Sequence, residues 1–160
     1  MKLEIEKFYR VGNIEFPNLK DAKKYIEINN NNSYYFGEEE KEEIALGIKS
    51  NVDVSIYAKH EFDYFQMKEI RLGLEKKLDV SWYAKPEFDE YQMKEIREGL
   101  EEGLDVSIYA NPDFNASQMY EIFTGLERSL DVSSYANPNI DWEEMERIRK
   151  ELESKKYLIK

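Results

Sequence analysis

The sequence predicts a mainly α-helical protein, a short α-solenoid of 26-residue helix-turn-helix repeats preceded by a small strand–strand–helix unit. The phrase Asp-Val-Ser-x-Tyr-Ala starts at Asp53, Asp79, Asp105 and Asp131, and the intervals 79−53, 105−79 and 131−105 are all 26. Such fixed-period self-similarity is typical of stacked repeat arrays. A recurring helix-start pattern in every repeat, and a different alternating pattern at the N-terminus, complete the prediction.

Residues 1–32 are expected to form the separate N-terminal unit. Charged and apolar residues alternate over 3–11, which favours a β-strand. Gly12-Asn13 is a two-residue turn signal, so 14–16 can return as a second strand. A capping pattern and helical apolar spacing then predict a helix over about 18–28. We interpret this unit as a cap for the array.

The repeat array is expected to fill residues 36–160. Its predicted parts are a half unit at 36–52, full units at 53–78, 79–104 and 105–130, and a terminal unit at 131–156. The terminal unit departs from the consensus, as expected where the outer face of an array meets water rather than a neighbour.

Each full unit reads as a short helix followed by a longer one. The longer helix starts at a capping residue that a Gln or Glu follows three positions later, the spacing of a capping box. These predicted caps are Asp63, Asp89, Asn115 and Asp141. An apolar residue before each cap and a Met four residues after it form a hydrophobic staple. A Gly recurs inside the long helix, where it costs about 1 kcal/mol against Ala, so we expect a close neighbour there, such as the repeat Tyr.

Composition limits the class of protein. Hydrophobic residues make up 41% of the chain and aromatic residues 14%, as in a packed protein. No apolar run approaches the roughly 20 residues of a membrane span, and the N-terminus lacks the apolar core of a secretion signal. Cysteine is absent, which excludes disulfides and cysteine zinc sites. We therefore expect an intracellular, cytoplasmic protein with no membrane contact.

Charge is distributed unevenly along the chain. The net charge is −11; residues 1–35 carry six Lys/Arg and five Asp/Glu (+1), and residues 36–160 carry 17 and 29 (−12). An acidic array repels phosphates, so direct binding of nucleic acid is disfavoured and a basic protein partner is favoured. The same charge would also serve solubility alone.

Residues that could perform chemistry have structural interpretations. The recurrent Asp residues stand where helix caps are needed, and no EF-hand loop is present. His60 takes the slot of a turn proline, and the recurrent Ser residues have no nucleophile elbow or histidine partner. We therefore expect no catalytic residues, no metal and no cofactor, although loose cation binding to stacked Glu rows stays open.

Positions that vary between repeats are the better candidates for a partner surface, because invariant positions fill the shared core. Several of these slots hold large aromatic residues, the usual anchors of binding interfaces: Tyr64, Phe65, Trp82, Tyr91, Tyr120, Phe123 and Trp142. The alternative is that these rings fill gaps at the junctions between repeats.

Two rows of Glu residues accompany the aromatic slots. One row contains Glu69, Glu95 and Glu121, and the other contains Glu75, Glu101, Glu127 and Glu153. Helices stack about 8–10 Å apart, a spacing comparable with that of phosphates along a nucleic-acid strand. These rows would permit nucleic-acid mimicry, although Arg and Lys on the same helices would weaken their field.

The repeat Asp-Val-Ser-x-Tyr-Ala-x-Pro-x-Phe-x-x-x-Gln-Met-x-Glu-Ile-Arg-x-Gly-Leu-Glu, as in residues 79–101, resembles a short repeat of poorly characterised phage and conjugative-element proteins. The match covers about residues 36–153 and supplies no catalytic residues. The resemblance implies a context in which small acidic proteins block host defence, including CRISPR effectors. Phe123 departs from the pattern, since Arg is usual in that slot, and His60 also departs from it.

The leading interpretation is a non-enzymatic binder that inhibits a basic, nucleic-acid-binding host defence protein, with a CRISPR effector nuclease as the leading candidate. It would occupy the nucleic-acid groove of that protein or an adjacent surface. An alternative is a scaffold that self-associates through an unpaired N-terminal strand edge, which leaves a homo-oligomer open. The third interpretation, an enzyme with its site in the N-terminal unit, has no titratable cluster to support it.

Overall fold

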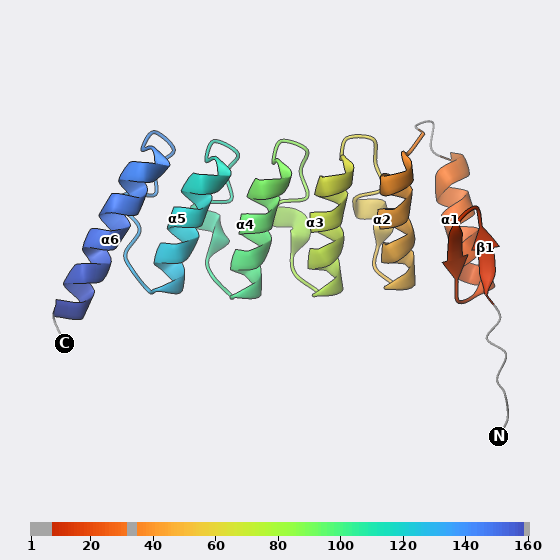
Figure 1. Cartoon of the computed structure of the whole chain (residues 1–160), viewed down its shortest axis with the longest axis horizontal. Coiled ribbons are helices and arrows are strands. Elements are labelled where there is room, and N and C mark those ends of the chain that lie inside the picture. The colour runs from red at the N-terminus through yellow and green to blue at the C-terminus, as the bar shows by residue number, and fades with distance from the viewer. Residues whose placement is uncertain (1–7, 32–34, 159–160) are drawn as a thin grey trace, which may run out of the picture. The chain divides into compact units, whose positions relative to one another are not determined.

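The computed structural model describes residues 8–31 and 35–158, and it is mainly helical, with 59% of the described residues in helices. A small antiparallel sheet precedes the helices, as the sequence predicts (Figure 1). The chain divides into two compact units, Met1–Glu75 and Lys76–Lys160, each described below by itself. Among the described residues, no helix combines the length and the apolar character needed to cross a membrane.

The first unit opens with a two-stranded hairpin and a helix. Strands β1 (Tyr9–Val11) and β2 (Ile14–Phe16) pair antiparallel around a turn in which Gly12 has a φ of +60°. Helix α1 (Leu19–Asn31) begins after Asn18, whose side chain accepts a hydrogen bond from the Asp21 N–H. The buried Phe16 ring packs on Tyr25 with 5.2 Å between ring centroids, which joins hairpin and helix. The part of the expected first strand at residues 3–7 lies outside the described residues.

The rest of the first unit contains the first repeat elements. Helix α2 (Glu38–Lys49) packs on α1 and on α3 (Tyr64–Glu75), and the short segment η1 (Val54–Ile56) connects α2 to α3. Figure 1 shows α2 and α3 side by side with η1 behind them.

The second unit repeats this arrangement. It contains η2 (Val80–Trp82), α4 (Glu90–Glu101), η3 (Val106–Ile108), α5 (Ala116–Glu127) and α6 (Trp142–Leu158). Helix α5 lies between α4 and α6 and contacts both (Figure 1). The short helix that we expected is a single 3-10 turn before α3, α4 and α5 and a plain turn at residues 133–135 before α6, because the run between the Asp cap and the following turn is too short for an α-helix.

The capping pattern places the long helices. Asp89 accepts a hydrogen bond from the Gln92 N–H at 2.8 Å, and the Gln92 side chain accepts from the Asp89 N–H at 2.8 Å. The same reciprocal pair forms at Asp63 and Asn115, while Asp141 accepts from the Glu144 N–H. The free amide of Gln92 donates to the carbonyls of Pro112 and Phe114, so this side chain also ties α4 to the next repeat.

The recurrent Gly and the recurrent Tyr form one packing feature. A Cβ on Gly99 would lie 1.9 Å from the Tyr109 Oη, and the same distance separates Gly125 from Tyr135. Both Tyr rings are fully buried, and each hydroxyl donates to a helix carbonyl, that of Glu95 for Tyr109. The glycine is therefore required because a phenol ring lies against the helix backbone, which fixes the short segment behind the long helices.

Candidate functional site

A pocket with a volume of about 560 Å³ lies across all three long helices of the Lys76–Lys160 unit. We call it the aromatic pocket, and its lining is Tyr91, Lys94 and Glu95 of α4, Ala116, Ser117, Tyr120 and Glu121 of α5, and Trp142 and Glu146 of α6. Five of these residues, namely Tyr91, Glu95, Tyr120, Glu121 and Trp142, are partner-binding candidates from the sequence. The fold therefore brings variable positions of three consecutive repeats together on one surface.

The aromatic rings of this pocket are open to solvent. Tyr91, Tyr120 and Trp142 are 63%, 50% and 41% exposed. Exposed large aromatic residues that gather around one depression are typical of binding surfaces.

The other aromatic candidates lie outside this pocket. Phe65 on α3 is exposed and meets the half-buried Tyr64 edge to face, with 5.0 Å between ring centroids. Trp82 is exposed in η2, and Phe123 is half-buried on α5. Tyr157, exposed near the end of α6, is an aromatic residue that the repeat comparison did not single out.

The first Glu row belongs to the interior of the helix stack. In this row Glu121 is 4% exposed, and its carboxylate accepts a hydrogen bond from the Arg149 Nε at 2.7 Å, 28 residues along the chain. Glu43 and Arg71 form the same buried pair in the first unit at 2.6 Å. An Arg from one repeat thus neutralises a Glu from the preceding one.

Glu95 breaks this pattern. The residue 28 positions after it is Phe123, where the other repeats have Arg. Glu95 is only 9% exposed, and its Oε2 atom is buried without a hydrogen-bond partner. Burial raises the pKa of Glu95 to about 7, and the nearby Glu98 carboxylate adds to the rise. Glu95 thus combines the absence of the repeat arginine with a raised pKa.

The second Glu row shows the same exception. Glu75, Glu101 and Glu153 each pair with the Arg four residues earlier, which is Arg71, Arg97 and Arg149 respectively. A residue 25 positions earlier gives each a second contact, from Ser50, Lys76 and Arg128.

Glu127, the exposed fourth member of this row, has Phe123 four residues earlier and Glu102 25 residues earlier, so neither position supplies a cation. Across the described residues, Glu127 has no ion pair. The α4–α5 interface therefore lacks both cations that the α5–α6 interface contains, Arg149 and Arg128.

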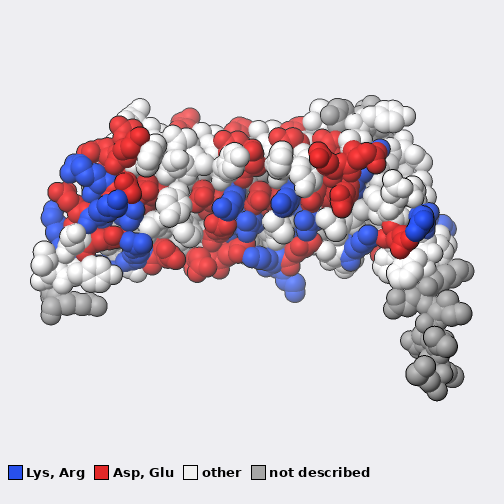
Figure 2. All heavy atoms as spheres, in the orientation of Figure 1, with Lys and Arg blue, Asp and Glu red and all other residues white. Residues whose placement is uncertain are grey.

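The chain around this interface is strongly acidic. Residues 98–127 contain seven carboxylate residues and no Lys or Arg. Figure 2 shows the result on one face, where basic residues gather over α6 while acidic and uncharged residues dominate over α5. The two Glu rows are therefore not a uniform line of free charge; the uncompensated charge lies between α4 and α5.

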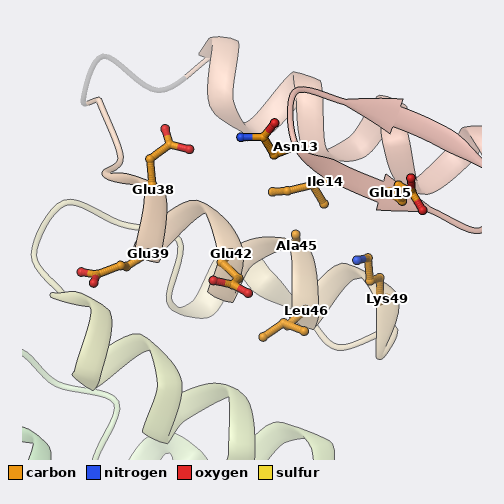
Figure 3. Close-up of a pocket in the computed structure, with 9 residues that line it drawn as sticks. All are labelled: Asn13, Ile14, Glu15, Glu38, Glu39, Glu42, Ala45, Leu46 and Lys49. Atoms are coloured by element: carbon orange, nitrogen blue, oxygen red, sulfur yellow. The ribbon is translucent and has the colours of Figure 1, made fainter.

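A second pocket, with a volume of about 450 Å³, lies in the first unit between the hairpin turn and α2 (Figure 3). Its lining includes Glu15, Glu38, Glu39 and Glu42. Glu15 pairs with Arg10 and Glu38 pairs with Lys41, and both carboxylates are largely exposed. Among the described residues that line this pocket, no buried polar side-chain atom lacks a hydrogen-bond partner, so the pocket gives no indication of a ligand.

Other chemistry has little support in the geometry. Within the described ranges, no three His, Asp or Glu side chains gather in a way that could hold a metal ion. The Ser107 hydroxyl donates to the Asp105 carboxylate, as Ser55 does to Asp53 and Ser81 to Asp79. These hydroxyls thus take part in the cap of the 3-10 turn.

The comparisons with known proteins leave the family open. No protein-family model matches the chain, and neither a curated protein nor a solved structure matches it. The resemblance to repeats of mobile-element proteins therefore stays a prediction, and the functional argument depends on the geometry above.

Proposed function

We propose that this chain is a non-enzymatic, acidic helical-repeat protein that binds a basic partner protein through the aromatic pocket of its Lys76–Lys160 unit. One observation carries the proposal: Tyr91, Tyr120 and Trp142 come from three repeats, stay exposed, and line a pocket together with Glu95, whose buried Oε2 atom has no hydrogen-bond partner. Aromatic anchors supply contact area, and complementary charge steers a basic partner toward them.

The partner proposed from the sequence is a nucleic-acid-binding host defence protein, with a CRISPR effector nuclease as the leading candidate. Such proteins present basic grooves, which suit an acidic binder. Mimicry of a phosphate backbone by regular Glu rows has less support than contact through the pocket, because Glu75, Glu101 and Glu121 are engaged in ion pairs of the chain itself.

Self-association is the second candidate function. Its specific support is the hairpin, since each strand of the described two-stranded sheet has one edge without a strand partner. Light scattering at several concentrations separates the candidates: a monomer at all concentrations favours the partner-binding proposal.

A capture experiment tests the main proposal. The wild-type protein is immobilised beside a pocket variant, Tyr91→Ala/Tyr120→Ala/Trp142→Ala, and beside a control variant, Phe65→Ala, whose exposed ring lies on α3. Quantitative mass spectrometry of proteins from a bacterial lysate is expected to find basic proteins that the wild type and Phe65→Ala retain and the pocket variant loses. Retention should fall as salt is raised. Equal retention by the pocket variant would overturn the proposal.

A further inference from the structure

One repeat position beside the aromatic pocket holds Phe123, whereas the other repeats hold an arginine there. At the two equivalent positions described above, Arg71 pairs with Glu43 and Arg149 pairs with Glu121, both in buried ion pairs. Phe123 takes the place of the corresponding arginine on α5, and the Glu95 Oε2 atom is left buried without a partner. A buried, unpaired carboxylate oxygen is costly, so it indicates either strain or a missing ligand.

The surrounding charges do not fill this position. Lys94, which also lines the pocket, is half exposed, and its ammonium lies 3.8 Å from the Glu98 carboxylate. The Arg97 guanidinium pairs with Glu101 on the same helix. The two other carboxylates of the pocket have their own cations, because Glu121 pairs with Arg149 and Glu146 pairs with Lys150 at 2.7 Å. The uncompensated negative charge of the pocket is therefore that of Glu95.

The aromatic rings determine which cation suits the site. Tyr91, Tyr120 and Trp142 line the same pocket as Glu95 and are exposed. A guanidinium group is planar, stacks on aromatic faces and pairs with a carboxylate through two parallel hydrogen bonds. A lysine ammonium is more strongly hydrated, so its transfer from water into the pocket costs more free energy. Arginine is also the side chain that the fold itself uses at the equivalent buried positions.

We propose that the aromatic pocket receives an arginine side chain of a partner protein, with Glu95 as the carboxylate that pairs with its guanidinium and Tyr91, Tyr120 and Trp142 as the rings around it. This inference rests on the proposed function and specifies the chemistry by which the same site recognises its partner. The partner's arginine would complete, in trans, the interhelical ion pair that other repeats complete in cis. Its arrival would also lower the pKa of Glu95, which burial raises to about 7 in the free protein.

The chain offers a variant that closes the site from within. Phe123→Arg introduces the arginine that, in other repeats, pairs with the Glu 28 residues earlier. Its guanidinium should therefore pair with the Glu95 carboxylate and exclude an arginine from outside the chain. Glu95→Gln removes the charge without changing the size of the side chain. Glu90→Gln is the matched control, because Glu90 lies on the same helix but outside the pocket lining.

The experiment uses the full chain and three blocked Gly-X-Gly peptides, in which X is arginine, lysine or citrulline. Citrulline keeps the shape of arginine without its charge. Binding is followed by the chemical shifts of Trp142 and Tyr120 in nitrogen-15 NMR spectra, which also show that each variant is folded. We expect the arginine peptide to bind at least about fivefold more tightly than the citrulline peptide, and Glu95→Gln and Phe123→Arg to weaken it by a similar factor. Glu90→Gln should bind it as the wild type does.

Three results would overturn the inference. They are equal binding of the arginine and citrulline peptides, equal binding of the arginine and lysine peptides, and undiminished binding by folded Phe123→Arg. The capture experiment keeps this failure distinct from failure of the proposed function. If the basic partner is lost by the aromatic variant but retained by Glu95→Gln and Phe123→Arg, the pocket binds a partner without an arginine at Glu95. If the aromatic variant also retains the partner, the proposed function itself is wrong.

Discussion

The α5–α6 and α4–α5 interfaces are built from the same repeat, but only the α5–α6 interface pairs its buried glutamate with an arginine. Between α5 and α6, Arg149 joins Glu121 and Glu153 into one network. Between α4 and α5, Phe123 stands in the place of that arginine, and Glu95 has a buried oxygen without a partner. The comparison teaches that one repeat interface lacks the internal ion pair of the other, and that it does so at the surface where the exposed aromatic residues gather.

The largest expected effect comes from breaking the intact interface. Arg149→Met should lower the free energy of unfolding by about 3–5 kcal/mol, because it leaves the Glu121 carboxylate buried without its cation. Urea denaturation at pH 7 measures the change. The matched control is Phe123→Met, which alters the equivalent slot without changing charge and should cost about 1–2 kcal/mol. Similar losses in the two variants would contradict the importance of the buried pair.

Glu95→Gln should change how stability depends on pH. The folded-state pKa of Glu95 is about 7, above its ordinary value of 4.5, so the native state holds the proton more tightly than the unfolded state. The stability that this proton provides is complete below pH 4.5 and is lost as pH rises through 7. Glutamine stays neutral, so the variant should equal the wild type near pH 4.5.

At pH 8 the same variant should exceed the wild type by up to about 3 kcal/mol. Urea midpoints measured from pH 4.5 to 8 follow the difference. Glu90→Gln serves as the control and should show no comparable growth with pH. A Glu95→Gln curve parallel to the wild-type curve would mean that Glu95 ionises normally.

Phe123→Arg should repair the divergent interface. We expect a coupling free energy of at least about 3 kcal/mol between positions 95 and 123 at pH 8, measured by a double-mutant cycle with Glu95→Gln. The gain should shrink toward pH 4.5, because the wild-type Glu95 is protonated there and no longer carries an unpaired charge. A coupling near zero in folded variants would show that an arginine on α5 does not reach Glu95, unlike Arg149 on α6.

Glu102→Lys should have the smallest effect. Residue 102 corresponds in the repeat to Lys76 and Arg128, which pair with Glu101 and Glu153. The new lysine should therefore pair with Glu127 and add about 0.2–1 kcal/mol of stability, since the pair is exposed. The gain should disappear at 1 M salt. A gain that persists at high salt would indicate a cause other than the ion pair.

Most of the fold could be predicted from sequence because it depends on local and periodic signals. The cap at Asp89, the staple around Phe88 and the 26-residue period each specify the position and start of a long helix. The recurrent Gly99 predicted a close neighbour, and Tyr109 is that neighbour. The sequence predicted a short helix where the structure has only the 3-10 turn Val106–Ile108, because a cap and a few apolar residues do not distinguish a single turn from a helix.

The candidate site could be predicted only in part. The variable slots identified Tyr91, Tyr120 and Trp142, and the recurrent Glu row identified Glu95 and Glu121. The pocket brings these five residues together. The departure at Phe123 was visible in the sequence, but its consequence was not. A repeat alignment shows which positions correspond, whereas the pairing of Glu121 with a residue 28 positions later depends on how helices stack in space. The missing partner of Glu95 therefore required the three-dimensional arrangement.

The most direct test of the difference between the two interfaces is the ionisation of Glu95 itself. A carbon-13 NMR titration of the glutamate side-chain carboxyl groups, with Glu95 assigned through Glu95→Gln, measures its pKa in the wild type and in Phe123→Arg. We predict a midpoint near pH 7 in the wild type and below 4.5 in Phe123→Arg. A wild-type midpoint at or below 4.5 would show that a cation of the chain already neutralises Glu95, and would contradict an unfilled arginine position.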